Sequence, residues 1–366
     1  MGSKVIEDLE VRSLRRGVEQ PLTLSTIESI AGIWRRVLGR TAISVEDNFF
    51  DLGGDPSSAA KLFSEIARIC GRELPPLTIY QAPTIASLAA LLDQSAPVRI
   101  PPLLLLKPGN AVPPVFITHG IGSSVMDFFD LARHLETPHA VYGMQARGMD
   151  GVEEPFDRIE DMAQFFLDAI KAVQPRGPYL LIGYSLGGLV TLEMAQRLVE
   201  NGEQVALLSL LETYPHRSQL SSAARFQLYT RLARHHGSTM AKLPMRGVIP
   251  YIVGGSKHRW KVSQDGVGSE NRSPSVLELP TPAARHVYEK AYSALMRYRP
   301  RAYGGRIRFA KAAISLRFPE NPAAVWADLL TNLEVETVPG DHQGIIATHF
   351  ESLATVLTRY LNEACT

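Results

Sequence analysis

The chain after residue 102 alternates between short apolar runs and amphipathic segments with helical spacing. Segments with helical periodicity, such as 159–172 and 189–199, lie between most of the apolar runs. Strands that are apolar along their whole length, with helices between them, pack as a mostly parallel sheet covered on both faces. We therefore predict an α/β fold. The expected strands are 103–106, 115–118, 140–144, 179–182, 205–211, 307–312 and 333–338.

A smaller helical unit is expected before this region. The stretch from Ser95 to Pro102 contains three prolines, which end a helix and stiffen an extended connection. Four short segments with helical patterning precede it and predict a small bundle. We divide the chain into a tail (1–23), a helical domain (24–95), a linker (96–110) and a sheet domain (111–366).

The interval 215–300 breaks the alternation of strands and helices. Its pattern is largely helical, with many charged residues and scattered glycines. Because it follows the strand expected at 205–211, we expect an insertion over the C-terminal edge of the sheet, which would act as a lid.

Composition excludes several classes of partner. The net charge is +1 with both signs interspersed, so no nucleic acid or anionic membrane partner is expected. The two cysteines, Cys70 and Cys365, lack metal-ligand spacing and predict neither a metal site nor a disulfide framework. No apolar run reaches the ~18 residues of a membrane span, and no signal peptide is evident. These features predict a soluble, cytoplasmic protein.

One serine stands in a sequence typical of a nucleophile. Gly183-Tyr184-Ser185-Leu186-Gly187-Gly188 follows the apolar run 179–182 and precedes the helical segment 189–199. Small residues around a serine between a strand and a helix permit the sharp turn that exposes its hydroxyl. A serine nucleophile needs a base, and the base needs an orienting carboxylate.

The best candidate for the base is His342, which follows the last expected strand on the tight loop Val338-Pro339-Gly340-Asp341. Glu212, at the end of the run 205–211, is the preferred acid, because this position lies at the level of Ser185. Glu320, after the next strand, is the rival acid. Asp341 is disfavoured because neighbours on one turn rarely face each other.

Stabilising an oxyanion requires two converging backbone N–H groups. The N–H of Leu186 follows the nucleophile at the start of a helix, where the dipole favours anions. The second is expected from the loop His119-Gly120-Ile121-Gly122-Ser123, with Ile121 as the preferred donor. We interpret His119 as a residue that orients this loop rather than as the base.

Two resemblances follow from these motifs. Residues 115–350 resemble the thioesterase domains that end nonribosomal peptide and polyketide assembly lines. The matching runs are Gln174-Pro175-Arg176-Gly177-Pro178-Tyr179, the Ser185 motif and Pro339-Gly340-Asp341-His342. Residues 24–94 resemble an acyl or peptidyl carrier domain through Asp47-Asn48-Phe49-Phe50-Asp51-Leu52-Gly53-Gly54-Asp55.

The resemblance implies an α/β-hydrolase domain with a helical lid, preceded by a four-helix carrier-like bundle. It implies hydrolysis or cyclisation of an acyl or peptidyl thioester through an acyl-enzyme on Ser185, without a cofactor for catalysis. The expected partners are an acyl or peptidyl carrier protein or synthetase modules.

Two positions depart from this resemblance. The family usually carries aspartate where Glu212 stands, and glutamate can still hold an imidazolium. Carrier domains attach phosphopantetheine to a serine directly after Gly-Gly-Asp, where this chain has Pro56. Either Ser57 accepts the group instead, or the carrier-like domain is never loaded, and we favour the second interpretation.

Two other functions stay open on the sequence alone. The sheet domain could be a general esterase or amidase that acts on free small molecules. The N-terminal bundle could be a docking module that recruits a separate synthetase or a loaded carrier.

Overall fold

The computed structural model describes residues 24–94, 96–242, 281–315 and 318–365. The expected tail at 1–23 and much of the expected lid, 243–280, lie outside the described residues. The chain divides into two compact units, Met1–Arg99 and Ile100–Thr366. Each unit is described by itself.

The first unit is a small helical bundle, as predicted. Its elements are α2 (Leu24–Leu38), α3 (Pro56–Cys70), the 3₁₀ helix η1 (Pro76–Tyr80) and α4 (Ile85–Asp93). Trp34, Phe49, Leu62 and Ile66 are fully buried in its core, and the Trp34 and Phe49 rings meet edge to face at 5.1 Å. The apolar spacing of α3 predicts an inward face of Ala59, Leu62, Phe63, Ile66 and Cys70. The first four are buried, whereas Cys70 at the end of the helix is exposed.

The second unit contains one seven-stranded sheet in the order β1-β3-β2-β4-β5-β6-β7. β1 runs antiparallel to β3 at one edge, and the other neighbours are parallel, so the prediction of a mostly parallel sheet is confirmed. The strands are β1 (Leu103–Lys107), β2 (Ala111–Thr118), β3 (His139–Met144), β4 (Tyr179–Tyr184), β5 (Val205–Leu211), β6 (Tyr303–Ala312) and β7 (Leu330–Val338).

The expected boundary of the sheet domain needs correction. The linker predicted at 96–110 contains β1, an edge strand of the sheet, and the second unit begins at Ile100 rather than at 111. The apolar run 103–106 belongs to the sheet because pairing with β3 satisfies its backbone polar groups.

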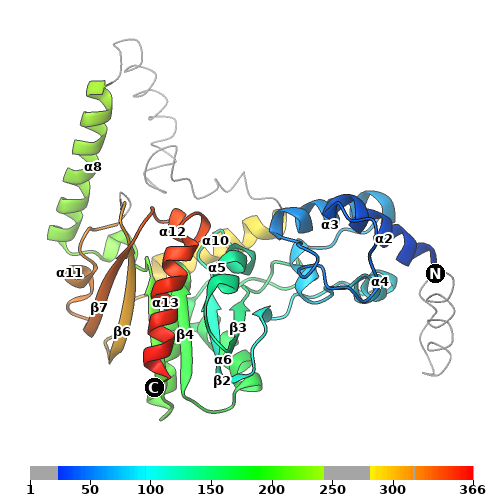
Figure 1. Ribbon diagram of the computed structural model, residues 1–366. Helices are drawn as coiled ribbons and strands as arrows, with labels where there is room; N and C mark the ends of the chain where they lie inside the picture. Colours follow the sequence, from blue (N-terminus) through cyan, green and yellow to red (C-terminus); the bar gives the residue numbers. More distant parts are fainter. Residues whose placement is uncertain (1–23, 95, 243–280, 316–317, 366) are drawn as a thin grey trace. The chain divides into compact units, whose positions relative to one another are not determined.

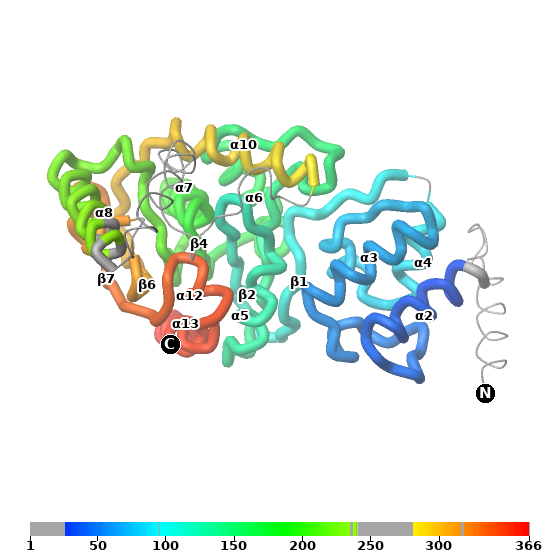
Figure 2. Tube along the Cα trace, turned by 90° about the horizontal axis from the view of Figure 1, so that it is seen from above, coloured from blue at the N-terminus to red at the C-terminus, as the bar shows by residue number. Residues whose placement is uncertain are grey.

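Helices cover both faces of the sheet (Figures 1 and 2). One face packs against α5 (Phe129–His134) and α13 (Phe350–Ala364), which share a core with Ile117, Leu180 and Ile182. The other face packs against α6 (Ile159–Val173), α7 (Leu186–Glu200) and α10 (Pro282–Arg297). Alternate strand residues enter the two cores, so the sheet is buried on both sides as its apolar strands predict.

The described part of the expected lid is helical. It contains η3 (Arg217–Gln219), α8 (Ser222–Lys242) and α10. α8 extends away from the sheet in Figure 1, and Phe226 on this helix is 70% exposed. Three short elements complete the unit: η2 (Val125–Phe128), α11 (Pro322–Trp326) and α12 (Gly344–Ala347). Among the helices described, none has the length and apolar character to cross a membrane.

Candidate active site

Ser185 lies at the turn between β4 and α7, as predicted. Its backbone has φ 55° and ψ −119°, and its N–H donates to the carbonyl of Leu211 in the neighbouring strand at 2.8 Å. Within the described part of the chain, only Ser185 and Glu212 are non-glycine residues with positive φ. Such strained residues cost roughly 1–3 kcal/mol each and cluster at functional sites. The turn thus has the geometry of a nucleophile elbow.

The glycines beside Ser185 are required by close packing. A Cβ on Gly183 would lie 2.2 Å from Thr191 Oγ1, and one on Gly187 would lie 2.4 Å from the carbonyl oxygen of His119. A Cβ on Gly188 would approach Thr213 Oγ1 to 1.9 Å. A larger residue at Gly183 would push α7 away from β4, and one at Gly187 or Gly188 would push it away from β2 or from the end of β5. The small residues therefore fix the direction in which α7 leaves the turn.

Glu212 follows β5 directly and lies at the level of Ser185. Its side chain is fully buried, and its Oε2 atom is 3.4 Å from Nδ1 of His342. Its Oε1 atom accepts a hydrogen bond from the N–H of Ala312 at 2.7 Å. Since a buried carboxylate needs partners for both oxygens, these two contacts fix its orientation. The structure brings the predicted acid and base together.

The ring of His342 is held by aromatic neighbours. Tyr184 stacks on it with the ring centroids 5.0 Å apart, and the Tyr184 hydroxyl donates to the backbone carbonyl of His342 at 2.6 Å. Phe318 contacts the ring at a tilted angle, also at 5.0 Å. With Nδ1 directed at Glu212, Nε2 is the nitrogen left for Ser185. Across the described residues, no hydrogen bond joins the Ser185 hydroxyl to His342, and such bonds often form only when substrate is bound.

The rival acids are placed elsewhere. Glu320 is 80% exposed and lies 3.9 Å from Arg231. Asp341 accepts hydrogen bonds from the N–H groups of Gln343 and Gly344 and so caps the start of α12. The structure therefore pairs His342 with Glu212 rather than with either rival.

His119 orients the loop that carries Ile121. Its Nε2 accepts from the backbone N–H of Ala146 and lies 3.1 Å from the side-chain nitrogen of Gln145. Its Nδ1 therefore carries the proton and donates to the carbonyl of Gly120 at 2.8 Å. Burial lowers the pKa of His119 to about 4, although the bond to Gly120 opposes this shift. His119 is thus a neutral positioning residue, as predicted.

Two residues of the site, Gln145 and Tyr184, were not predicted from the sequence. Gln145 accepts from the N–H of Val125 and contacts His119, so it joins η2 to the loop of Ile121. A polar residue directly after the apolar strand β3 was the available signal. Tyr184 gave no signal, because an aromatic residue inside a buried strand is ordinary core.

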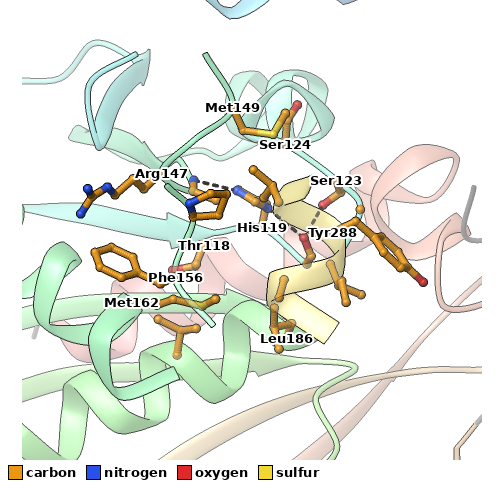
Figure 3. Close-up of a pocket in the computed structure, with 18 of the residues that line it drawn as sticks. Thr118, His119, Ser123, Ser124, Arg147, Met149, Phe156, Met162, Leu186 and Tyr288 are labelled. Carbon is orange, nitrogen blue, oxygen red and sulfur yellow. Dashed lines mark hydrogen bonds between the residues drawn. The ribbon is translucent and has the colours of Figure 1, made fainter. Parts of the chain in front are cut away.

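The two predicted oxyanion donors line one cavity. Ile121 and Leu186 both contact a space of about 240 Å³ (Figure 3). Leu186 is the first residue of α7, where backbone N–H groups lack partners within the helix. Their convergence on a substrate oxygen stays a prediction.

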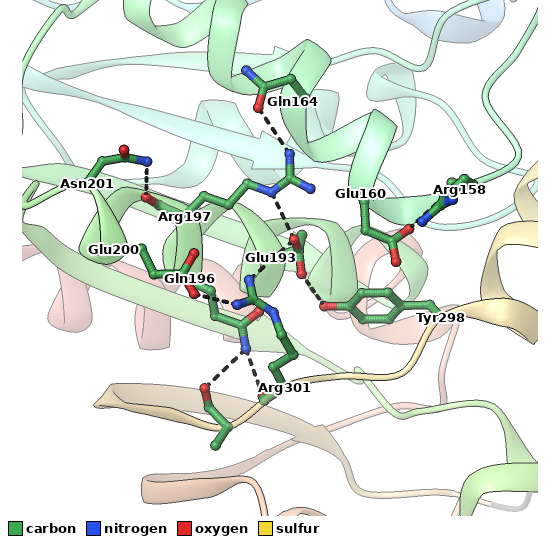
Figure 4. A network of polar contacts seen from close by, with 11 residues as sticks. Arg158, Glu160, Gln164, Glu193, Gln196, Arg197, Glu200, Asn201, Tyr298 and Arg301 are labelled. Carbon is green, nitrogen blue, oxygen red and sulfur yellow. Dashed lines mark hydrogen bonds and ion pairs between the residues drawn. The ribbon is translucent and has the colours of Figure 1, made fainter.

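A network of polar contacts around the buried Glu193 joins α7 to the chain that follows α10 (Figure 4). Glu193 on α7 is only 3% exposed and accepts from Arg197 at 2.9 Å and from the Tyr298 hydroxyl at 3.0 Å. Arg301 is also within 3.5 Å of it. Because these partners neutralise a buried carboxylate, they fix the C-terminal end of α10 against α7.

The position expected to carry phosphopantetheine lies at the start of α3. Pro56 is the first residue of this helix, and Asp55 caps it. Ser58 completes a capping box: its N–H donates to the Asp55 carboxylate at 2.6 Å, and its hydroxyl accepts from the Asp55 N–H at 2.7 Å. Hydrogen bonds from Ser58 lower the pKa of Asp55. Ser57 is exposed, so it is the accessible hydroxyl at this end of the helix.

Family models match both units. Residues 28–92 match the model described as a phosphopantetheine attachment site, and this match includes Pro56. Residues 113–244 match the thioesterase domain model. Together with the sheet topology, these matches define an α/β-hydrolase of the thioesterase class preceded by a carrier-type domain. The chain therefore contains a carrier-type domain followed by a thioesterase domain.

Curated relatives and a solved structure agree with this assignment. A dimodular nonribosomal peptide synthase of Bacillus subtilis (strain 168) is 30% identical over 293 residues, which cover 78% of this chain and 12% of the relative. Malpinin synthetase of Mortierella alpina is 38% identical over 195 residues, which cover 51% of this chain and 2% of that protein. This chain therefore spans only a small part of these relatives. The crystal structure of a four-domain nonribosomal peptide synthetase matches 94% of this chain and 26% of its own, with a TM-score of 0.55 and 20% identity, and so supports the fold.

The buried His119 predicts a loss of stability in mild acid. The unfolded chain binds a proton on this residue at a pKa near 6.5, whereas the folded chain does so only near 4. The unfolded state therefore gains protons first as the pH falls from 6.5 towards 4, and stability is lost over this window. Because of His119, we expect the free energy of unfolding to fall by about 2–3 kcal/mol between pH 7 and pH 4.5.

Urea denaturation of the wild type and of His119→Gln at both pH values measures this contribution. The variant is expected to show the smaller decrease, because glutamine does not titrate. His134→Gln is the control, since His134 is half-exposed on the surface of α5. An equal decrease in the wild type and His119→Gln would contradict the assignment.

Proposed function

We propose that the second unit is a serine thioesterase that releases an acyl or peptidyl chain from a carrier-bound thioester. The observation that carries the proposal is the strained backbone of Ser185 at the same sheet edge as the buried Glu212–His342 pair. Because residues 113–244 match the thioesterase domain, we infer that the substrates of this serine are thioesters rather than simple esters or amides.

In the first step, the Ser185 hydroxyl attacks the thioester carbonyl while Nε2 of His342 takes its proton. The carbonyl oxygen becomes an oxyanion, which the N–H groups of Ile121 and Leu186 stabilise. The carbon–sulfur bond then breaks, and the sulfur of the carrier arm leaves with the proton from His342. The product is an ester between Ser185 and the acyl chain.

In the second step, a nucleophile attacks the Ser185 ester after giving its proton to His342. Water yields the free acid by hydrolysis, and a nucleophile within the chain yields a ring. In both cases His342 returns the proton to the Ser185 oxygen. Glu212 stabilises the imidazolium that forms in each step, and its bond from Ala312 N–H keeps it aligned.

The carrier-type unit is proposed to dock rather than to carry the substrate. Pro56 offers no hydroxyl at the attachment position, and Ser58 is committed to the capping box with Asp55. The thioester is then delivered by a carrier protein or synthetase module outside this chain. Attachment to Ser57 is the alternative, supported by its exposure.

The serine mechanism predicts the effect of two substitutions. Ser185→Ala is expected to lower turnover of an acyl thioester by at least ~10³-fold, since the covalent route is lost. Glu212→Gln is expected to lower kcat by at least ~10²-fold, because a neutral amide cannot stabilise the imidazolium. Release of free thiol from an N-acetylcysteamine thioester, followed with a thiol reagent, measures both.

Glu320→Gln is the matched control for the acid, because Glu320 is exposed and does not contact His342. It should retain turnover within about twofold. Full activity in Ser185→Ala would refute the serine mechanism. Equal losses in Glu212→Gln and Glu320→Gln would refute the assignment of the acid.

Loading of the carrier-type unit is predicted to fail in the wild type. Incubation with coenzyme A and a permissive phosphopantetheinyl transferase should leave the intact mass unchanged. In Pro56→Ser the hydroxyl returns to the first position of α3, and one phosphopantetheine should be added. Modification of the wild type on the peptide that contains Ser57 would overturn the docking proposal.

A further inference from the structure

The cavity beside the candidate oxyanion donors has a mostly apolar wall, with hydroxyl groups and two charged side chains at parts of its lining. It lies between the loop of Ile121, the start of α7, α6 and α10, and it measures about 240 Å³. Apolar side chains from all four elements, together with Phe156 and Met149, form most of the wall (Figure 3). Apolar walls bind apolar groups, because burial removes about 25 cal/mol of unfavourable hydration per Å².

The charged residues at this cavity are engaged with the protein itself. The Arg147 side chain lies 3.4 Å from Glu153 and packs over the Phe156 ring at 4.9 Å. Figure 3 draws its guanidinium on the side away from Leu186 and Tyr288. The Asp127 carboxylate accepts from the N–H of Ser124 at 3.2 Å. Each charged group therefore has at least one contact of its own within the protein.

One face of α10 forms the wall opposite α6 and α7. Ala284, Val287, Tyr288 and Ala291 lie on this face and all contact the cavity. The two alanines are seven residues apart, which is about two helical turns. Their small side chains therefore leave space at two positions along the helix axis. Tyr288 lies against the oxyanion loop: a Cβ on Gly122 would be 3.0 Å from its ring. α10 therefore limits the cavity beside the loop of Ile121.

Polar contacts hold α10 in this position. Glu154 pairs with His286 at 3.0 Å and with Lys290 at 2.7 Å on its outer side. Asp157 pairs with Arg297 at 2.7 Å near its end. The Tyr298 hydroxyl reaches the buried Glu193 of α7. These contacts join the middle of α10 to the segment before α6 and its C-terminal end to α7. Side-chain size on α10 is therefore one determinant of the width of the cavity.

We propose that this cavity binds the acyl group next to the thioester carbonyl and selects a compact, uncharged chain, with Ala284 and Ala291 setting its length. The inference rests on the proposed function, since it assigns the substrate class of that same site. Pockets that hold drug-sized ligands measure about 300–1,000 Å³. At about 240 Å³ this one is smaller, so it suits a short aliphatic or aromatic acyl group rather than a peptide of several residues.

The size limit is tested by filling the space at Ala291. N-acetylcysteamine thioesters of acetyl, hexanoyl and octanoyl groups and of an uncapped tripeptide are compared by kcat/KM. The wild type should prefer hexanoyl or octanoyl to the tripeptide by at least tenfold. Ala291→Phe should lower the octanoyl-to-acetyl ratio of kcat/KM at least tenfold, because pocket size discriminates by about 10–200-fold per methylene.

Two further variants provide an alternative and a control for this test. If Ala291→Phe folds poorly, Ala284→Leu takes its place. It adds a smaller side chain one level along α10 and should lower the octanoyl-to-acetyl ratio as well. Glu289→Phe adds the same ring to an exposed position of α10 outside the cavity. This control should leave the octanoyl-to-acetyl ratio within about twofold of the wild type.

A binding measurement separates this inference from the proposed function. The probe is an octanoyl pantetheine amide, in which nitrogen replaces the thioester sulfur, and the protein is the full chain with Ser185→Ala. Calorimetry should detect binding that weakens at least tenfold when Ala291→Phe is added. Binding without turnover in the wild type would refute the thioesterase and keep the pocket. Preference for the tripeptide, or an unchanged ratio in both alanine variants, would overturn the pocket assignment.

Discussion

The left-handed backbone of Ser185 is the constraint on which the site depends. This conformation costs about 1–3 kcal/mol, and packing around it must hold it in place. The Ser185 N–H bonds to Leu211, and the glycines at 183, 187 and 188 leave no space for a Cβ against β2, α7 and Thr213. The same turn starts α7, so it places the Leu186 N–H beside Ser185.

Glu212 repeats this arrangement on the neighbouring strand. It also has positive φ, and its N–H bonds to Ala310 of β6 while its side chain receives the N–H of Ala312. A buried carboxylate is costly unless it is fully paired, and His342 supplies the second partner. Strand pairing at the C-terminal edge thus determines the position of the acid, and the acid determines the orientation of the imidazole.

The features of the fold and site that depend on local sequence were predictable. The apolar runs gave all seven strands, and the Gly183–Gly188 motif gave the turn, because only small residues permit such packing. The choice between Glu212 and Glu320 required the sheet: both follow strands, but only Glu212 is buried beside His342. The strand at 103–106 was expected, but the linker bounds 96–110 placed it outside the sheet domain, and its pairing with β3 is a long-range contact.

The carrier-type unit and the cavity show what sequence alone leaves undecided. The proline at position 56 was evident from the motif. The role of Ser58 became clear only from the structure, where Ser58 and Asp55 form a capping box at the start of α3. The lid sequence did not distinguish an acyl from a peptidyl substrate. The structure adds that the small residues of α10 share one face, and that this face lines the same cavity as Ile121 and Leu186.

Detection of the acyl-enzyme tests the central claim most directly. The full chain is mixed with octanoyl-N-acetylcysteamine, quenched in acid during turnover, digested and analysed by mass spectrometry. The account predicts one octanoyl group on the peptide that contains Ser185, absent in Ser185→Ala. Turnover without any adduct, or an adduct on another residue that persists in Ser185→Ala, would contradict it.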